Sequence, residues 1–76
     1  MIAMRGAVKI SLNDLNGALL DLNKAIELES SDGYMYYYRG IAKNKLGDNT
    51  NACLDLKKAI ELGYEEASVA LKEICK

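Results

Sequence analysis

Aromatic side chains are gathered in one short stretch of this chain, and they are its strongest candidates for binding chemistry. Four of the five tyrosines lie within residues 34–38, in "YMYYYRG", and there is no Phe or Trp. Tyrosine combines a rigid apolar ring with a hydroxyl, and it is frequent among the hot spots of protein interfaces. A packed core is the alternative use of the same rings. Whether a ring serves an interface or the core depends on the face of the helix or strand on which it lies.

Residue types that catalysis or metal binding needs are scarce. The chain has no His, so neither a Ser–His nor a Cys–His pair can form, and no cluster of Cys and carboxylates has the spacing of a metal site. No Gly-rich phosphate loop precedes a helix. Glu65 and Glu66 are adjacent, so they point to different sides of a helix and suit its N-terminal turn better than a catalytic pair. We therefore expect no enzyme and no cofactor.

The two cysteines, Cys53 and Cys75, are too few for a disulfide scaffold. We expect free, partly buried thiols in a reducing compartment, and hence a cytoplasmic location. A periplasmic or secreted location would follow if an upstream signal had been removed. Folding helices 50–62 and 65–75 back on each other places residue 53 level with residue 74. A disulfide that ties down the last helix is therefore the alternative.

Length and charge limit the architecture and the partners. A chain of 76 residues allows one domain with a modest core. The net charge is −1 without any block of like charge, so nothing indicates binding to nucleic acid or to an anionic membrane. No apolar run approaches the ~18 residues of a membrane span.

The chain repeats itself with a period of 34 residues. "DLNKAIEL" (residues 21–28) and "DLKKAIEL" (residues 55–62) match at seven of eight positions, and residues 1–28 laid on 35–62 give fifteen identities of twenty-eight without a gap. Each unit shows apolar residues at helical spacing, for example Ala52, Leu56, Ala59 and Ile60. The repeat therefore predicts two helices in each unit.

Turn and cap residues divide the chain into five helices. The predicted boundaries, in chain order, are Leu12, a turn at 13–16, Glu29, a cap at Ser31 or Asp32, Gly47, a cap at Asp48 or Asn49, and Gly63. After Gly63, "YEEASVALKEICK" predicts a fifth helix whose positive end carries Glu65 and Glu66. The pairs Asp21/Lys24 and Asp55/Lys58, three residues apart, are expected to be solvated pairs on helix faces.

The period and the small residues resemble the tetratricopeptide repeat (TPR) family, whose pattern is W-x2-L-G-x2-Y, then A-x3-F, then a late Ala and a Pro. The second unit gives Tyr36-x2-Arg39-Gly40-x2-Lys43, then Ala52-x3-Leu56, then Ala59. The first gives Ile2-x2-Arg5-Gly6-x2-Lys9, then Ala18-x3-Leu22, then Ala25. Both units lack the closing Pro, and both have Arg and Lys in place of the usual Leu and Tyr.

The resemblance covers essentially the whole chain and implies an all-α fold. It implies antiparallel helix–turn–helix repeats stacked as a short right-handed α-solenoid of about five helices. Repeat 1 would span residues 1–32, repeat 2 residues 33–66, and a capping helix residues 65–76. In the same pattern, Gly40 and Ala52 allow the two helices of one hairpin to approach closely, and Ala59 allows the next repeat to pack.

By this resemblance, the first helix of each repeat lines a concave groove that binds peptides or extended protein segments. One face of the helix over residues 34–45 carries the residues that we predict to bind a partner, namely Tyr34, Tyr37, Tyr38, Ile41 and Lys45. Tyr36 lies with Gly40 and Lys43 on the side of the hairpin partner, so we expect it to be structural. The expected function is a non-catalytic protein–protein interaction module whose partner is a protein or peptide.

Two other functions remain open at this point. Repeat stacks need about three units for stability, so the chain is alternatively part of a longer array or an element that self-associates as a homo-oligomer. Single-stranded RNA binding is the second alternative, because stacking rings and cations alternate near Tyr37 and Arg39. The near-neutral charge and the 34-residue period weigh against nucleic acid.

Overall fold

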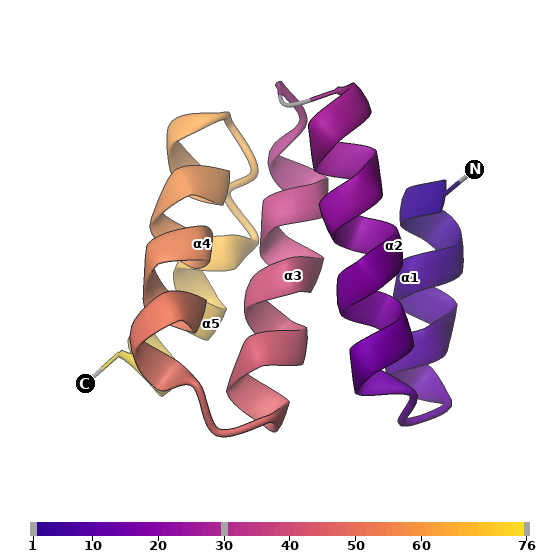
Figure 1. Cartoon of the computed structure of the whole chain (residues 1–76). Helices are drawn as coiled ribbons and strands as arrows, with labels where there is room; N and C mark the ends of the chain where they lie inside the picture. Colours follow the sequence, from indigo (N-terminus) through magenta and orange to yellow (C-terminus); the bar gives the residue numbers. More distant parts are fainter. Residues whose placement is uncertain (1, 30, 76) are drawn as a thin grey trace.

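The computed structural model describes residues 2–29 and 31–75, and every regular element in them is an α-helix (Figure 1). The helices are α1 (Ile2–Ser11), α2 (Leu15–Leu28), α3 (Gly33–Lys45), α4 (Asn49–Glu61) and α5 (Ala67–Ile74). The predicted all-α class with five helices is therefore confirmed for the described residues.

Aspartates cap three helices and glycines end two of them. The side chains of Asp14, Asp32 and Asp48 accept hydrogen bonds from backbone N–H groups at the starts of α2, α3 and α4. Gly47 and Gly63 have φ values of 89° and 96°, a left-handed conformation that glycine adopts at little cost. Of the two residues predicted for each cap, Asp32 and Asp48 are the caps, and the predicted glycine ends are confirmed.

The start of α5 differs from the prediction. The helix begins at Ala67, and Glu66 is its N-cap residue without a side-chain capping bond, so neither acid lies in the first turn. The backbone N–H of Ala67 instead bonds to the carbonyl of Tyr64 in a turn, and the Tyr64 hydroxyl donates to the Glu66 carboxylate over 3.1 Å. The apolar pattern located the helix, whereas this turn set its first residue.

The helices pack in chain order. Each helix lies against the next one, and α1 also touches α3. Figure 1 shows α3 between the α1–α2 hairpin and α4, with α5 behind α4 and the two termini at opposite ends. One apolar cluster is built on Leu22, Ala25 and Met35, and a second on Leu56, Ala59 and Ala67 (the α2–α3 cluster and the α4–α5 cluster). The right-handed solenoid stays a prediction.

Small residues set the close approach of neighbouring helices. A Cβ added to Gly40 would lie 3.1 Å from the carbonyl oxygen of Ala52 and 3.1 Å from Cγ of Leu56. A Cβ on Gly33 would lie 2.6 Å from the carbonyl oxygen of Ala59. The predicted close contact of α3 and α4 through Gly40 and Ala52 is therefore confirmed.

A disulfide joins Cys53 in α4 to Cys75 at the end of α5, with the two Cα atoms 5.9 Å apart. The prediction of two free thiols was therefore wrong, because the hairpin of α4 and α5 brings both cysteines to one level, as the alternative required. Disulfides persist mainly in oxidising compartments. This bond thus hints at such a compartment. No described helix has the length and apolar character that crossing a membrane requires.

Candidate functional site

Four tyrosine rings touch one another on one side of α3, and we call them the tyrosine cluster: Tyr34, Tyr37, Tyr38 and Tyr64. Ring centroids lie 4.8 Å apart for Tyr34–Tyr38, 5.0 Å for Tyr37–Tyr38, 5.1 Å for Tyr37–Tyr64 and 6.2 Å for Tyr34–Tyr64. These distances are in the range at which edge-to-face and tilted aromatic pairs attract. The structure thus brings the three predicted groove tyrosines together and adds a fourth.

Tyr64 was missed by the sequence prediction, which placed it in the fifth helix. It lies in the turn between α4 and α5, and a Cβ on Gly33 would be 2.9 Å from its Cβ. The predicted antiparallel hairpin of α3 and α4 could have indicated that Tyr64 belongs to the cluster. Because such a hairpin returns the chain to its starting level, the residue after Gly63 must lie beside the start of α3.

Each ring of the tyrosine cluster is half-buried. Tyr34 and Tyr38 pack on the α2–α3 cluster, and Tyr37 and Tyr64 pack on the α4–α5 cluster. Burial raises the pKa of the Tyr34 and Tyr37 hydroxyls. Burial, followed by the hydrogen bond to Glu66, raises the pKa of Tyr64 to about 12. The rings therefore combine the two uses considered from the sequence, since each packs on the core and keeps some accessible area.

The other two predicted groove residues extend the same helix face beyond the tyrosines. Ile41 is half-buried and Lys45, the last residue of α3, is exposed. Tyr36 lies on the other side of α3, where it packs on the α4–α5 cluster and the Arg39 guanidinium lies 5.2 Å from its ring centroid. The separation of Tyr36 from the other three tyrosines of α3 is as predicted.

An Arg–Asp–Lys network occupies the side of each hairpin where its two helices meet, and it occurs twice at the repeat spacing. In the first hairpin, Asp21 accepts two hydrogen bonds of 3.1 Å from Arg5, and the Lys9 ammonium lies 2.9 Å away. In the second, Asp55 accepts bonds of 2.9 Å and 2.8 Å from Arg39, and Lys43 lies 3.0 Å away.

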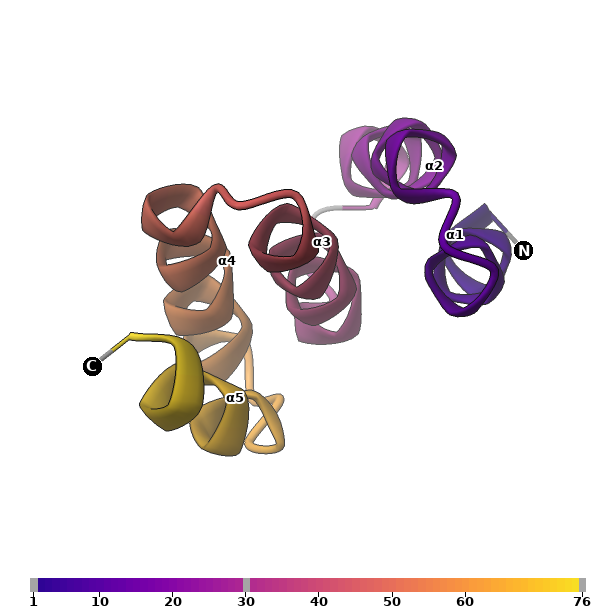
Figure 2. The same cartoon turned by 90° about the horizontal axis from the view of Figure 1, so that it is seen from below.

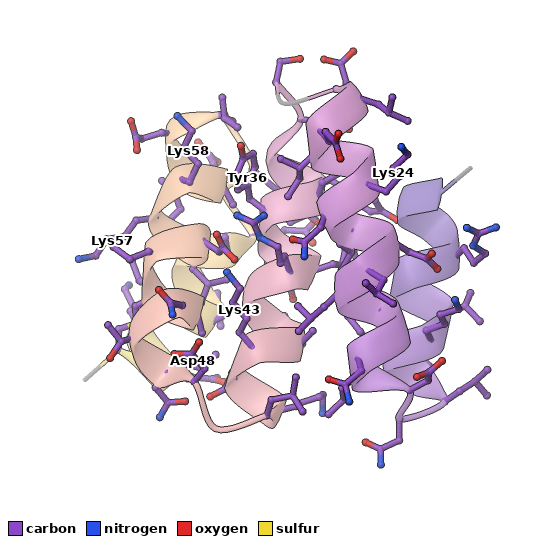
Figure 3. The ribbon with its side chains drawn as sticks, in the orientation of Figure 1. Lys24, Tyr36, Lys43, Asp48, Lys57 and Lys58 are labelled. Atoms are coloured by element: carbon purple, nitrogen blue, oxygen red, sulfur yellow. A yellow bond between two sulfur atoms is a disulfide. The ribbon has the colours of Figure 1, made fainter. Side chains whose placement is uncertain are left out.

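The prediction of solvated Asp21/Lys24 and Asp55/Lys58 pairs was wrong. Asp21 and Asp55 are 7% and 5% exposed, and their partners come from the preceding helix, whereas Lys24 and Lys58 are exposed. Figure 3 shows Lys43 between α3 and α4, below Tyr36 on α3, and Lys57 pointing away from the molecule. A buried carboxylate is stable only when charged groups pair with it. The preceding helix supplies these groups, and the exposed lysines on the same helix as each aspartate do not.

Arg5 is the main cause of a lowered pKa at Asp21. Its hydrogen bonds, followed by the one from Lys9, lower the pKa of the Asp21 carboxyl to about 2. Because the folded-state pKa lies below the usual ~3.9, the ionised pair stabilises the fold above about pH 4. That contribution is lost as the pH falls toward about 2.

The networks also connect the two hairpins. Arg39 donates a third hydrogen bond of 3.0 Å to the side-chain oxygen of Asn23 in α2. The Arg39 side chain is 19% exposed, whereas that of Arg5 is 62% exposed. Arg39 is therefore held by its own hairpin, by the hairpin before it and by the ring of Tyr36.

Among the described side chains, no group of three or more His, Cys, Asp and Glu residues is placed to hold a metal ion. The fold and the site define a small all-α domain with a repeated ion network and one aromatic surface. No family model, curated protein or solved structure is similar enough to this chain to count as a match.

Proposed function

We propose that this chain is a non-catalytic protein–protein interaction module of the tetratricopeptide type. It binds an extended peptide or protein segment along the face of α3 that carries Tyr34, Tyr37, Tyr38, Ile41 and Lys45. The observation that carries the proposal is the tyrosine cluster, because rigid half-exposed rings are what protein interfaces favour.

The arrangement of the helices supports the same proposal. Figure 2 looks nearly along the helix axes, with α1, α3 and α5 bordering one side of the ribbon and α2 on the opposite side. Stacked helical hairpins with this order present their first helices on one surface. The ion networks occupy the contacts between the helices of each hairpin, so they hold α3 without covering the tyrosines.

A periplasmic or secreted location is the better proposal for this module. The Cys53–Cys75 disulfide fits an oxidising compartment, and a cytoplasmic domain would keep the two thiols reduced. The expectation of a cytoplasmic location from the sequence depended on free thiols. A thiol count on denatured, unreduced protein purified from its native compartment tests the assignment.

Replacing Tyr37 with alanine should strongly weaken partner binding. We expect twelve-residue random peptides displayed on phage to be selected by the wild-type chain, and the affinity of the selected peptides to fall at least about tenfold in Tyr37→Ala, as for an interface hot spot. Isothermal titration calorimetry with synthetic versions of the selected peptides measures the change in affinity.

Two further variants separate binding from folding. Val69→Ala is the control on α5, because Val69 is 61% exposed and lies outside the predicted face. Lys45→Glu probes the exposed end of that face, where a substitution leaves the core packing intact. Selected peptides that bind Tyr37→Ala as well as the wild type, with equal helical content by circular dichroism, would rule out this face.

Self-association is the second candidate function, and a comparison of the two repeats favours it. Val8 in α1 is 56% exposed, whereas Ala42, its equivalent 34 residues later in α3, is completely buried. Arg5 is likewise far more exposed than Arg39, whose third hydrogen bond goes to α2. The outer face of α1 therefore lacks the cover that α3 has, and the same face of a second copy would supply it in a two-fold dimer.

Changing Val8 to lysine should abolish such a dimer. We expect light scattering at micromolar concentration to give the mass of a dimer for the wild type and of a monomer for Val8→Lys. The dimer contact would bury the charged lysine of each protomer without a partner, which is unfavourable. Val69→Lys is the matched control, since Val69 has a similar exposure on another helix. A monomeric wild type would eliminate this second function and leave peptide binding untouched.

A further inference from the structure

Carboxylates surround the tyrosine cluster. The Glu66 carboxylate accepts a hydrogen bond from the Tyr64 hydroxyl, and the charges of Glu66 and Glu73 help to raise the pKa of Tyr37, as smaller causes than burial and Tyr38. Asp32 acts in the same way on Tyr34, as a smaller cause than burial and Tyr38. These acids come from the start of α3, the turn before α5 and α5 itself, so they approach the rings from three elements.

These carboxylates have no cationic partner in the described part of the chain. Its four salt bridges all lie between α1 and α2 or between α3 and α4, where they use Asp21 and Asp55. The partner that Glu66 has is a neutral hydroxyl, which leaves its negative charge uncompensated. The nearest lysine along α5 is Lys72, which is exposed. The region from Asp32 across to α5 therefore has an excess of negative charge.

Aromatic faces and unpaired carboxylates attract the same kind of group. A Lys ammonium or an Arg guanidinium is drawn to the face of a tyrosine ring within about 6 Å of its centroid. A carboxylate beside the ring adds a charge-assisted hydrogen bond to the same cation. A phosphate backbone is repelled by these acids, so the surface is poorly suited to RNA.

We propose that the segment bound on the tyrosine cluster carries a lysine or arginine side chain, which lies against the rings of Tyr37 and Tyr64 and pairs with Glu66. This inference rests on the proposed peptide-binding function and narrows its partner to basic protein segments. Lys45 lies at the other end of α3, so the basic residue binds near the start of α3 and α5.

Random twelve-residue peptides on phage test the inference directly. We expect the peptides selected by the wild-type chain to be enriched in Lys and Arg relative to the unselected library. Glu66→Gln should weaken their binding about fivefold, the upper range for one exposed ion pair, while Gln keeps an oxygen that can accept the Tyr64 hydroxyl. Glu66→Lys should reverse the selection toward acidic peptides. Raising the salt from about 50 to about 500 mM should weaken the wild-type interaction, because exposed charges are screened.

Matched controls separate this inference from the proposed function. Glu27→Gln removes the same charge from the exposed surface of α2 and should leave the affinity unchanged. Neutral or acidic selected peptides whose binding depends on Tyr37 but not on Glu66 would overturn the basic partner and keep the peptide-binding function. The failure of any peptide to be selected would overturn both. Binding of a twelve-nucleotide polyuridine at low salt that depends on Tyr37 would replace the protein partner with RNA.

Discussion

Replacing Asp55 with alanine is expected to lower the free energy of unfolding by about 3 kcal/mol, the lower end of the range for breaking a buried ion pair. The variant leaves the Arg39 and Lys43 cations facing each other across an empty position. Arg39 cannot turn fully to water, because it is 19% exposed and is also held by Asn23 and the Tyr36 ring. Urea denaturation followed by circular dichroism measures the change.

The two repeats provide an internal comparison for this prediction. Asp21→Ala should cost clearly less than Asp55→Ala, because Arg5 is 62% exposed and recovers its hydration when the carboxylate is removed. Lys58→Ala is the control, since the sequence paired Lys58 with Asp55 while the structure leaves it exposed. We expect its effect to stay within about 0.5 kcal/mol. Equal losses for Asp55→Ala and Lys58→Ala would show that the network between the helices does not hold α3 on α4.

The helices could be predicted from the sequence because most of their boundaries depend on local chemistry. An aspartate that caps through its own side chain and a glycine that adopts a left-handed φ act within a few residues. Gly47 and Gly63 were therefore correctly assigned, and each cap was narrowed to two neighbours that include the true one, Asp32 or Asp48. The predicted start of α5 was wrong because residues 64–66 form a turn, closed by the Ala67 N–H on the Tyr64 carbonyl, and the apolar pattern does not contain this turn.

The ion networks could not be assigned from the sequence for a physical reason. Asp55 has Lys58 three residues away on its own helix, and this spacing normally indicates a local pair. Its actual partner, Arg39, lies 16 residues away on the preceding helix. The packing of α3 on α4 buries the Asp55 carboxylate beside Arg39, and this packing cannot be read from the spacing of Asp55 and Lys58. The sequence did contain a signal for the correct pairing, because Arg, Lys and Asp all recur in the two repeats at the same offset.

The candidate site was predictable in part. Helical spacing correctly separated Tyr36 from Tyr34, Tyr37 and Tyr38, since this depends only on the angle between residues of one helix. The extent to which each ring packs on its neighbours depends on the approach of α2 and α5. The sequence could therefore supply the face of α3 but neither the contribution of Tyr64 nor the half-burial of the rings.

Reduction of the Cys53–Cys75 disulfide should also lower the free energy of unfolding by about 3 kcal/mol. The cysteines are 22 residues apart, and a cross-link that closes a loop of this length restricts the unfolded chain by about that amount. A domain of this size has a total stability of only roughly 4–11 kcal/mol, so the loss is a large fraction of it. Urea denaturation with and without a thiol reductant measures the difference, and Cys53→Ser/Cys75→Ser should match the reduced protein.

The same bond should control the binding surface, because α5 supports half of the tyrosine cluster. Ala67 is completely buried in the α4–α5 cluster, on which Tyr37 and Tyr64 pack. Once α5 is no longer tied to α4, its eight residues are too short to persist as an independent helix. Amide hydrogen exchange should therefore accelerate in α5 on reduction, with less effect on α1 and α2, and the affinity for selected peptides should fall with it. Unchanged exchange in α5 after complete reduction would mean that apolar packing alone holds this helix, and peptide binding would then be independent of the redox state.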